Sequence, residues 1–191
     1  TPGSITAQLL QPVAPDAAEI LKQIKYVSTA TVTLAYKKEG FSHALDGFGF
    51  VVPKCEGRSI LACPWTSSKF PHRAPEGYVM IRCYLGGALQ EEIAEKDEST
   101  LITLVRQDLK EIMGVCEEPV FSKAFHNRKS NVQYHVNHSQ RIDAVMQGLE
   151  SGLFLAGSAY RGIGIPDCIQ SGTQSAESAI QLLMGKSNAE I

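Results

Sequence analysis

GLFLAGSAYRGIGIPDCIQSGTQSAESAIQLL, residues 152–183, divides into three successive parts. The apolar run at residues 153–156 lies between two glycines, which is the pattern of a short buried strand. A glycine-punctuated loop follows through residues 160–165. Pro166 and Asp167 then begin a helix. That helix carries these apolar residues along one side: Ile169, Ala176, Ala179, Ile180 and Leu183. The stretch therefore predicts a strand, a tight loop and a helix.

The loop between this strand and this helix has the features of an anion site. Free backbone N–H groups at a helix N-terminus, together with the positive end of the helix dipole, attract a negatively charged ligand. The glycines at 162 and 164 would let a phosphate or a flat ring come close to the backbone. An ordinary connection between a strand and a helix explains the same glycines, because a glycine-rich loop is a weak motif by itself.

The residue types in this stretch are more specific than their spacing. The stretch resembles the last motif of the protoporphyrinogen and coproporphyrinogen oxidases, members of the flavin amine-oxidase fold family, which reads roughly AGxxYxGVGxxDCIxSG. The matching positions are Ala156-Gly157, Tyr160, 162–165, 167–169 and Ser171-Gly172. The resemblance implies that this end of the chain returns to an FAD-binding domain. It also implies the residues that bind FAD: Gly162, Ile163, Gly164, Ile165 and Asp167.

Two earlier stretches extend the resemblance over nearly the whole chain. GFGFVVPKCEGRSILACPWTSSKFPHRAPEGYVMIRCYLGG, residues 47–87, is similar to the substrate-domain hairpins of these oxidases. QYHVNHSQRI, residues 133–142, is similar to their PQYxVGHxxRI segment. The chain departs from the family at Val132, which replaces a proline, and at Asn137, which replaces a glycine. The opening Thr1-Pro2 resembles the point at which the family's chain leaves the FAD domain.

The middle of the chain predicts an α+β fold. Alternating apolar residues and β-branched side chains predict four strands, at residues 26–36, 47–52, 59–64 and 78–85. Short connections between these strands favour a mostly antiparallel sheet. The helix predicted at residues 99–113 has an apolar stripe on one face and should cover this sheet. Further predicted elements are a helix from Pro15, a short helix at 89–95, strands at 120–125 and 132–136, and a helix at 141–149.

The family resemblance implies two domains. We expect a portion of the substrate-binding domain at residues 1–137 and a carboxyl-terminal FAD-binding segment at residues 138–191. A chain of 191 residues is long enough for one core, or for one domain and a piece of another. The dinucleotide fingerprint G-x-G-x-x-G does not occur in it. In the family that fingerprint lies upstream of the position of Thr1, so we expect this fragment alone to be inactive.

Composition excludes several classes of function. A formal net charge of −2 gives no electrostatic reason to expect nucleic acid as a partner, and no apolar run is long enough to span a membrane. The five cysteines are odd in number and widely spaced, which argues against a disulfide framework or a zinc site. Cys63 and Cys83 are interpreted as small buried hydrophobes. This cysteine usage favours a reducing compartment, and we expect a cytoplasmic location.

Single side chains give no catalytic assignment. His135 and His138 are interpreted as surface or packing residues, and Trp65 as part of the core or of a pocket wall. Three arginines could meet carboxylates of a substrate, although solvated strand and loop roles are commoner: Arg58, Arg73 and Arg82. Just upstream of residue 133 the family commonly places a flavin-contacting tryptophan. This chain has Phe125-His126 there, and neither residue is assigned to the flavin.

The resemblance implies a fragment of an FAD-dependent porphyrinogen oxidase of haem biosynthesis. Such an enzyme oxidises coproporphyrinogen III or protoporphyrinogen IX, with oxygen as the acceptor and peroxide as product. The expected partner is thus a small-molecule porphyrinogen, bound by residues that the sequence does not identify. The absence of any side-chain catalytic cluster agrees with chemistry carried by a flavin. Two alternatives stay open: a porphyrin-binding module without catalysis, and a flavin amine oxidase with another substrate. The oligomeric state is not predicted.

Overall fold

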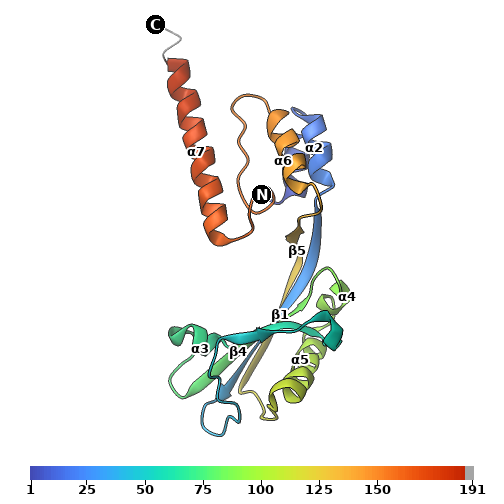
Figure 1. The fold of residues 1–191 in the computed structure, drawn as a ribbon, viewed down its shortest axis with the longest axis vertical. Coiled ribbons are helices and arrows are strands. Elements are labelled where there is room, and N and C mark those ends of the chain that lie inside the picture. Colours follow the sequence, from blue (N-terminus) through green and yellow to red (C-terminus); the bar gives the residue numbers. More distant parts are fainter. Residues whose placement is uncertain (188–191) are drawn as a thin grey trace. The chain divides into compact units, whose positions relative to one another are not determined.

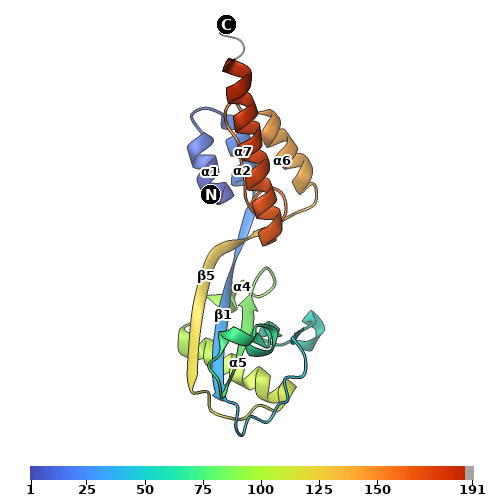
Figure 2. The same cartoon turned by 90° about the vertical axis from the view of Figure 1, so that its left-hand side faces the viewer.

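The computed structural model describes residues 1–187, which form two compact units (Figures 1 and 2). Thr1–Tyr26 and Val132–Ile191 make up the terminal unit, and Val27–Asn131 make up the middle unit. The helices are α1 (Gly3–Leu10), α2 (Pro15–Lys22), α3 (Thr66–Lys69), α4 (Glu91–Ala94), α5 (Glu98–Met113), α6 (His138–Gln147) and α7 (Ile165–Ser187). The strands are β1 (Lys25–Lys37), β2 (Gly49–Val51), β3 (Ile60–Pro64), β4 (Tyr78–Gly86) and β5 (Phe121–Gln133), and two short 3₁₀ turns are η1 (Lys54–Glu56) and η2 (Pro71–Arg73).

The middle unit is built on a five-stranded sheet of order β2-β3-β4-β1-β5. β1 pairs with β4 in antiparallel register from Thr29 opposite Gly86 to Lys37 opposite Tyr78. β3 is antiparallel to both of its neighbours. The predicted α+β class and the mostly antiparallel sheet are confirmed, and each of the four predicted strands lies within two residues of its predicted bounds, because one face of each strand packs into the core.

Helix α5 covers the sheet, as its apolar stripe predicts. Its buried face contributes Leu101, Val105 and Leu109 to the same core as the sheet residues. The helix begins where the Asp97 side chain accepts a hydrogen bond from the backbone N–H of Thr100, and its C-cap is Gly114 at φ 71°. The acidic cap at one end and the left-handed glycine at the other explain why the predicted bounds, 99–113, lie within one residue of the observed ones.

Strand β5 corrects the prediction of two separate strands at 120–125 and 132–136. The structure has one strand, Phe121–Gln133, beside the long β1. Val120 N–H donates to the backbone oxygen of Ala35, and the Asn131 side chain contacts Thr29, so the two strands run antiparallel. β1 is thirteen residues long and offers a continuous edge. This edge keeps the polar middle of β5 extended, although the sequence between its two apolar ends has no strand signal of its own.

The terminal unit has a helical core formed by α1, α2 and α6. α2 lies beside both of its partners, and the buried residues are mostly alanine, leucine and isoleucine (Figure 2). The helix predicted from Pro15 is confirmed as α2, with proline at its start. The helix predicted at 141–149 begins earlier, at His138. Helix α1 was not predicted. Its eight residues, GSITAQLL, include glycine, serine and threonine, which have low helix propensity.

The run at residues 153–156 is not a strand, which corrects the first of the three predicted parts. In the described residues this segment is extended without a neighbouring strand, and side chains of α7 satisfy part of its backbone instead. Ser175 Oγ donates to the backbone oxygen of Leu155 at 3.2 Å, and Gly157 N–H donates to Ser171 Oγ at 3.2 Å. Two serines one helical turn apart therefore form hydrogen bonds with backbone groups that a partner strand could have bound.

Helix α7 contacts the rest of its unit mainly through small and polar side chains. Half-buried residues recur along it at Cys168, Ser171, Ser175, Ala179 and Leu182, whereas most of its large apolar side chains face solvent. Ile169 is 65% exposed, and others behave similarly: Ile180, Leu183 and Met184. The compact units also differ from the expected division at residue 137, because residues 1–26 pack with the carboxyl-terminal segment rather than with the sheet.

Candidate functional site

The five residues predicted to bind FAD lie together in one tight loop and the first turn of α7. Gly162 has φ +74°, in the left-handed region that favours glycine. A Cβ added to Gly162 would lie 2.4 Å from the Cβ of Asp167, which no side chain could occupy without a shift. The loop is therefore folded back onto the start of α7, and glycine at 162 is required by both backbone and space.

Asp167 closes this loop. Its Oδ2 accepts a hydrogen bond from the backbone N–H of Gly164 at 3.1 Å, as an acidic residue in the first turn of a helix commonly does. The sequence-based interpretation of Asp167 as a first-turn residue is confirmed. The interpretation of the loop as a site with free N–H groups needs correction, because one of these donors already has an acceptor. Pro166 supplies no N–H, and the carboxylate brings negative charge to the place where an anion would bind.

Two apolar side chains flank the loop. Ile163 is 66% exposed and Ile165, the first residue of α7, is 78% exposed. Large apolar side chains displayed next to a closed backbone turn favour the face of a flat ring over a phosphate group. The geometry thus offers one wall of a site for a planar ligand.

The residues before the loop are held on both sides. Tyr160 is 3% exposed, and its hydroxyl lies 2.7 Å from Thr6 Oγ1. Its backbone oxygen accepts a hydrogen bond from His138 Nε2 at 3.0 Å. The His138 ring is buried and stacks on Tyr134, with ring centroids 3.8 Å apart. His138 therefore has the packing role expected for it, and its bond to a carbonyl assigns the proton to Nε2.

A polar hollow of about 300 Å³ adjoins the loop. It is lined by Arg161, Gly162, Asp167, Gln170, Ser171 and Gln174. Arg161 forms an ion pair with Asp143 of α6. This hollow therefore presents the charged groups of Arg161 and Asp167 together with amide and hydroxyl groups.

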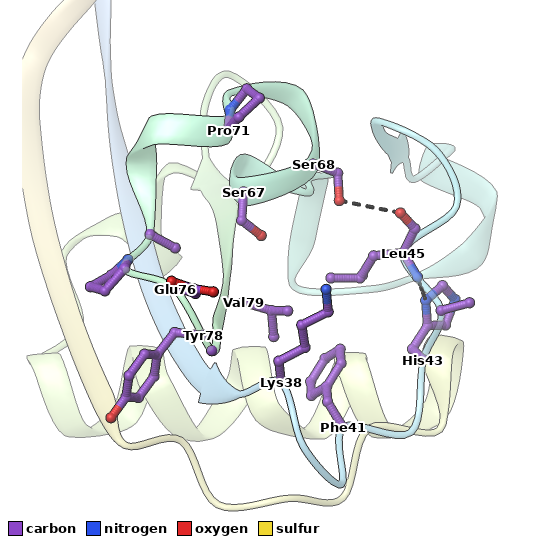
Figure 3. Close-up of a pocket in the computed structure, with 14 residues that line it drawn as sticks. Lys38, Phe41, His43, Leu45, Ser67, Ser68, Pro71, Glu76, Tyr78 and Val79 are labelled. Atoms are coloured by element: carbon purple, nitrogen blue, oxygen red, sulfur yellow. Dashed lines mark hydrogen bonds between the residues drawn. The ribbon is translucent and has the colours of Figure 1, made fainter.

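A larger hollow, of about 690 Å³, lies in the middle unit (Figure 3). The loop after β1 and the loop before β4 form it, and the side chains of Lys38 and Glu76 extend toward it in Figure 3. Its other polar groups serve the loops themselves. His43 Nδ1 accepts from the backbone N–H of Leu45, and Ser68 Oγ donates to the Leu45 oxygen, which together hold Leu45 at φ +49°.

The other candidate side chains of the middle unit have structural partners. His126 Nδ1 lies 2.7 Å from the backbone oxygen of Ala94, whereas Phe125 is 56% exposed. Arg58 pairs with Glu111, Arg73 lies over the ring of Phe70, and Arg82 Nε donates to Thr33 Oγ1. These contacts agree with the strand and loop roles expected for the arginines.

Buried thiols and the indole complete the core of the middle unit. Cys63 and Cys83 are fully buried, as predicted, and a hydrogen bond with Cys63, followed by burial, raises the pKa of the Cys83 thiol. Trp65 is 8% exposed, and its Nε1 is buried without a hydrogen-bond partner among the described residues. Across residues 1–187 no three ligand-type side chains gather as a metal site would require. The same residues include no helix that is long and apolar enough to cross a membrane.

Comparison with protein families gives one match along most of the chain. The model of the flavin containing amine oxidoreductases matches residues 1–180. The coproporphyrinogen III oxidase of Bacillus subtilis (strain 168) is 36% identical over an alignment of 166 residues that covers 85% of this chain and 35% of the relative. The chloroplastic protoporphyrinogen oxidase of Oryza sativa subsp. japonica is 29% identical over an alignment of 187 residues that covers 92% of this chain and 35% of the relative.

A solved structure shares the fold. The crystal structure of an Exiguobacterium sp. 255-15 protein, provisionally assigned as a protoporphyrinogen oxidase, superposes with a TM-score of 0.80 at 30% identity. The superposition covers 98% of this chain and 40% of that chain. The chain thus spans about a third of the length of the curated relatives it matches.

Proposed function

The chain belongs to the flavin-containing amine oxidoreductases, and we propose that it forms the carboxyl-terminal part of an FAD-dependent porphyrinogen oxidase of haem biosynthesis. The observation that carries this proposal is the match to porphyrinogen oxidases over 85% or more of the chain. FAD is the cofactor that this family membership implies. The fragment would supply one wall of the flavin site, and the sequence contains no dinucleotide fingerprint that could supply the others.

The glycine loop fits this role. We assign the wall to Gly162, Ile163, Gly164, Ile165 and Asp167. The closed turn and its two exposed isoleucines suit the plane of an isoalloxazine ring, while the Asp167 carboxylate makes the pyrophosphate an unfavourable neighbour. Bound FAD supplies the acceptor of hydride equivalents, which the side chains of this fragment do not offer. The residues of the loop would then orient the ring and exclude water from one side of it.

Coproporphyrinogen III is the substrate that we propose. Support comes from the higher identity to a bacterial coproporphyrinogen III oxidase, 36%, than to a plant protoporphyrinogen oxidase, 29%. Oxidation to coproporphyrin III removes hydrogen atoms from the macrocycle, and their electrons and protons reduce oxygen to hydrogen peroxide. A cytoplasmic location is part of the same proposal. Its support is the presence of five unpaired cysteines, which suits a reducing compartment.

Expression of this chain and of the full-length protein to which it would belong tests the proposal. Titrating FAD into the 191-residue chain should give weak binding or none, because the pyrophosphate-binding half is not part of it. The full-length protein should be purified with flavin absorbance and should form fluorescent porphyrin from coproporphyrinogen III faster than from protoporphyrinogen IX. A full-length protein that binds porphyrin without flavin would identify the binding module instead. Flavin binding with turnover of an amine and no porphyrin product would identify another oxidase.

A further inference from the structure

Tyr160 ties the glycine loop to a distant part of the sequence. Its ring is packed in the helical core of the terminal unit, where it is 3% exposed. Its hydroxyl meets Thr6 of α1, a residue 154 positions earlier in the chain. The Thr6 hydroxyl also lies 2.5 Å from Thr1 Oγ1 and 3.2 Å from the backbone oxygen of Pro2, so the bond to Tyr160 belongs to a small network at the start of α1 in which either hydroxyl can donate. The amino-terminal helix and the glycine loop therefore share one buried hydrogen bond.

The backbone of the same residue is fixed from the opposite side. His138 Nε2 donates to the oxygen of Tyr160 at 3.0 Å, and the Tyr134 hydroxyl donates to the oxygen of Ser158 at 2.7 Å. Tyr134 also stacks on His138 with an angle of 11° between the ring planes. One stacked pair of side chains thus binds the carbonyl groups of Ser158 and Tyr160, just before the loop. The His138 ring is buried, whereas Tyr134 is 41% exposed and is restricted by the stacking and by its own hydrogen bond.

The loop spans two anchors. Tyr160 is the first, and the Asp167 bond to Gly164 is the second. Within the part of the chain that the structure describes, the backbone of Arg161, Gly162 and Ile163 has no hydrogen-bond partner, and Gly162 has a left-handed φ. A short segment held at both ends has few conformations, and its position depends on each anchor. Loss of either anchor should widen the positions that Ile163 can adopt.

We propose that Tyr160 is a positioning residue for the FAD-facing loop, held by Thr6 through its hydroxyl and by His138 through its backbone oxygen. This inference rests on the proposed function in naming FAD as the ligand. It adds that α1, which lies far from the last motif in the sequence, contributes to flavin affinity through Thr6. Removal of the hydroxyl bond leaves the Tyr160 ring in the core, so the unit stays folded while the loop loses one anchor.

Three variants of the full-length protein test the proposal: Tyr160→Phe, Thr6→Val and the double variant. FAD dissociation constants are measured by flavin absorbance after removal of the cofactor, alongside the melting temperature and the absorbance maximum of the bound flavin. Tyr160→Phe should weaken FAD binding about five- to tenfold, the effect of one net hydrogen bond. Thr6→Val should weaken it similarly. The double variant should be no weaker than Thr6→Val, because Thr6→Val already removes the bond to Tyr160 together with the contacts of Thr6 with Thr1 and Pro2.

Tyr26→Phe is the matched control. The Tyr26 hydroxyl also binds α1, where it accepts from the Gly3 N–H at 2.7 Å, but among the described residues no hydrogen bond joins it to residues 160–164. A general loosening of α1 would lower FAD affinity and stability in this control as much as in Tyr160→Phe. That result, or unchanged FAD affinity in a folded Tyr160→Phe protein, would overturn the proposal.

Hydrogen exchange on the 191-residue chain separates this inference from the proposed function. The Tyr160 and Gly164 amides, which donate to the Gly157 oxygen and to Asp167 Oδ2, should exchange faster in Tyr160→Phe than in the unmodified chain, and at an unchanged rate in Tyr26→Phe. Faster exchange together with a full-length protein that binds no FAD would refute the proposed function while leaving the positioning role intact. Equal exchange in all three chains would refute the positioning role whatever the flavin content.

Discussion

Replacement of Gly162 by alanine is the sharpest test of how the loop is closed. The added Cβ would lie 2.4 Å from Asp167 Cβ and 2.6 Å from its Cγ, and the residue would need φ +74°. Neither contact can be relieved by rotating the alanine. Either the first turn of α7 moves, which breaks the bond between Asp167 and the Gly164 N–H, or the loop adopts another backbone path.

The expected loss follows from these two terms. A left-handed conformation costs a residue with a Cβ about 1–2 kcal/mol, and loss of a capping bond costs about 0.5–2 kcal/mol. Their sum is about 1.5–4 kcal/mol, or about ten- to thousandfold in an equilibrium constant. Gly57→Ala is the matched control. Gly57 also has a positive φ, +63°, but nothing lies within 4 Å of its added Cβ, so only the conformational cost of about 1–2 kcal/mol applies.

Urea unfolding of the 191-residue chain can separate the two effects. The single tryptophan, Trp65, lies in the middle unit, so its fluorescence reports that unit. Far-ultraviolet circular dichroism is dominated by helix and includes α1, α2, α6 and α7 of the terminal unit. Gly162→Ala should shift the dichroism transition and leave the fluorescence transition in place, whereas Gly57→Ala should shift the fluorescence transition. A Gly162→Ala chain with an unchanged dichroism transition would refute the steric argument.

Three further outcomes are expected from the middle unit. Leu109→Ala should lower the unfolding free energy of this unit by about 2–5 kcal/mol, as measured by tryptophan fluorescence. Leu104 is half-buried, so Leu104→Ala should cause a smaller loss, and equal losses would contradict the packing of α5 on the sheet. Asp108→Ala should cost about 1–3 kcal/mol, because its carboxylate accepts two backbone N–H groups at the start of β3, and Asp108→Asn should cost less. The hydrogen bond from Lys129 lowers the pKa of Glu91 from 4.5 to about 2, so Glu91 stabilises the unit above pH 4.5 and this contribution is lost as the pH falls toward 2. Acid unfolding of Glu91→Gln should lack that dependence, and an unchanged acid transition would count against it.

The sequence located the sheet and α5 because each has a local signal that tertiary contacts reinforce. Alternation marks β1 and β4, and an acidic cap and a glycine delimit α5. Residues 153–156 show the limit of such signals. Their apolar run predicts a buried strand, yet whether it pairs depends on a neighbour, and here two serines of α7 meet its backbone.

The candidate site was predicted in part. Gly162 and Asp167 stand out by residue type, and Asp167 takes the first-turn position expected of it. The role of Tyr160 could not be derived from the sequence, because its partner Thr6 lies in a helix with no recognisable signal and is 154 residues away. No local pattern encodes a contact of that range. A tyrosine two residues before a glycine loop is the only signal that could have indicated it.

The middle unit is an insertion whose two ends are neighbours. The chain leaves the terminal unit at Tyr26 and returns at Val132, and the Asn131 side chain lies 3.4 Å from Thr29 Oγ1. A short linker could therefore replace residues 27–131 at little cost in loop-closure entropy, and each unit could be produced as a separate protein. The same arrangement makes the insert a replaceable module. Mutation or recombination could exchange the sheet that it carries for another, while the terminal helices and the glycine loop kept their own core unchanged.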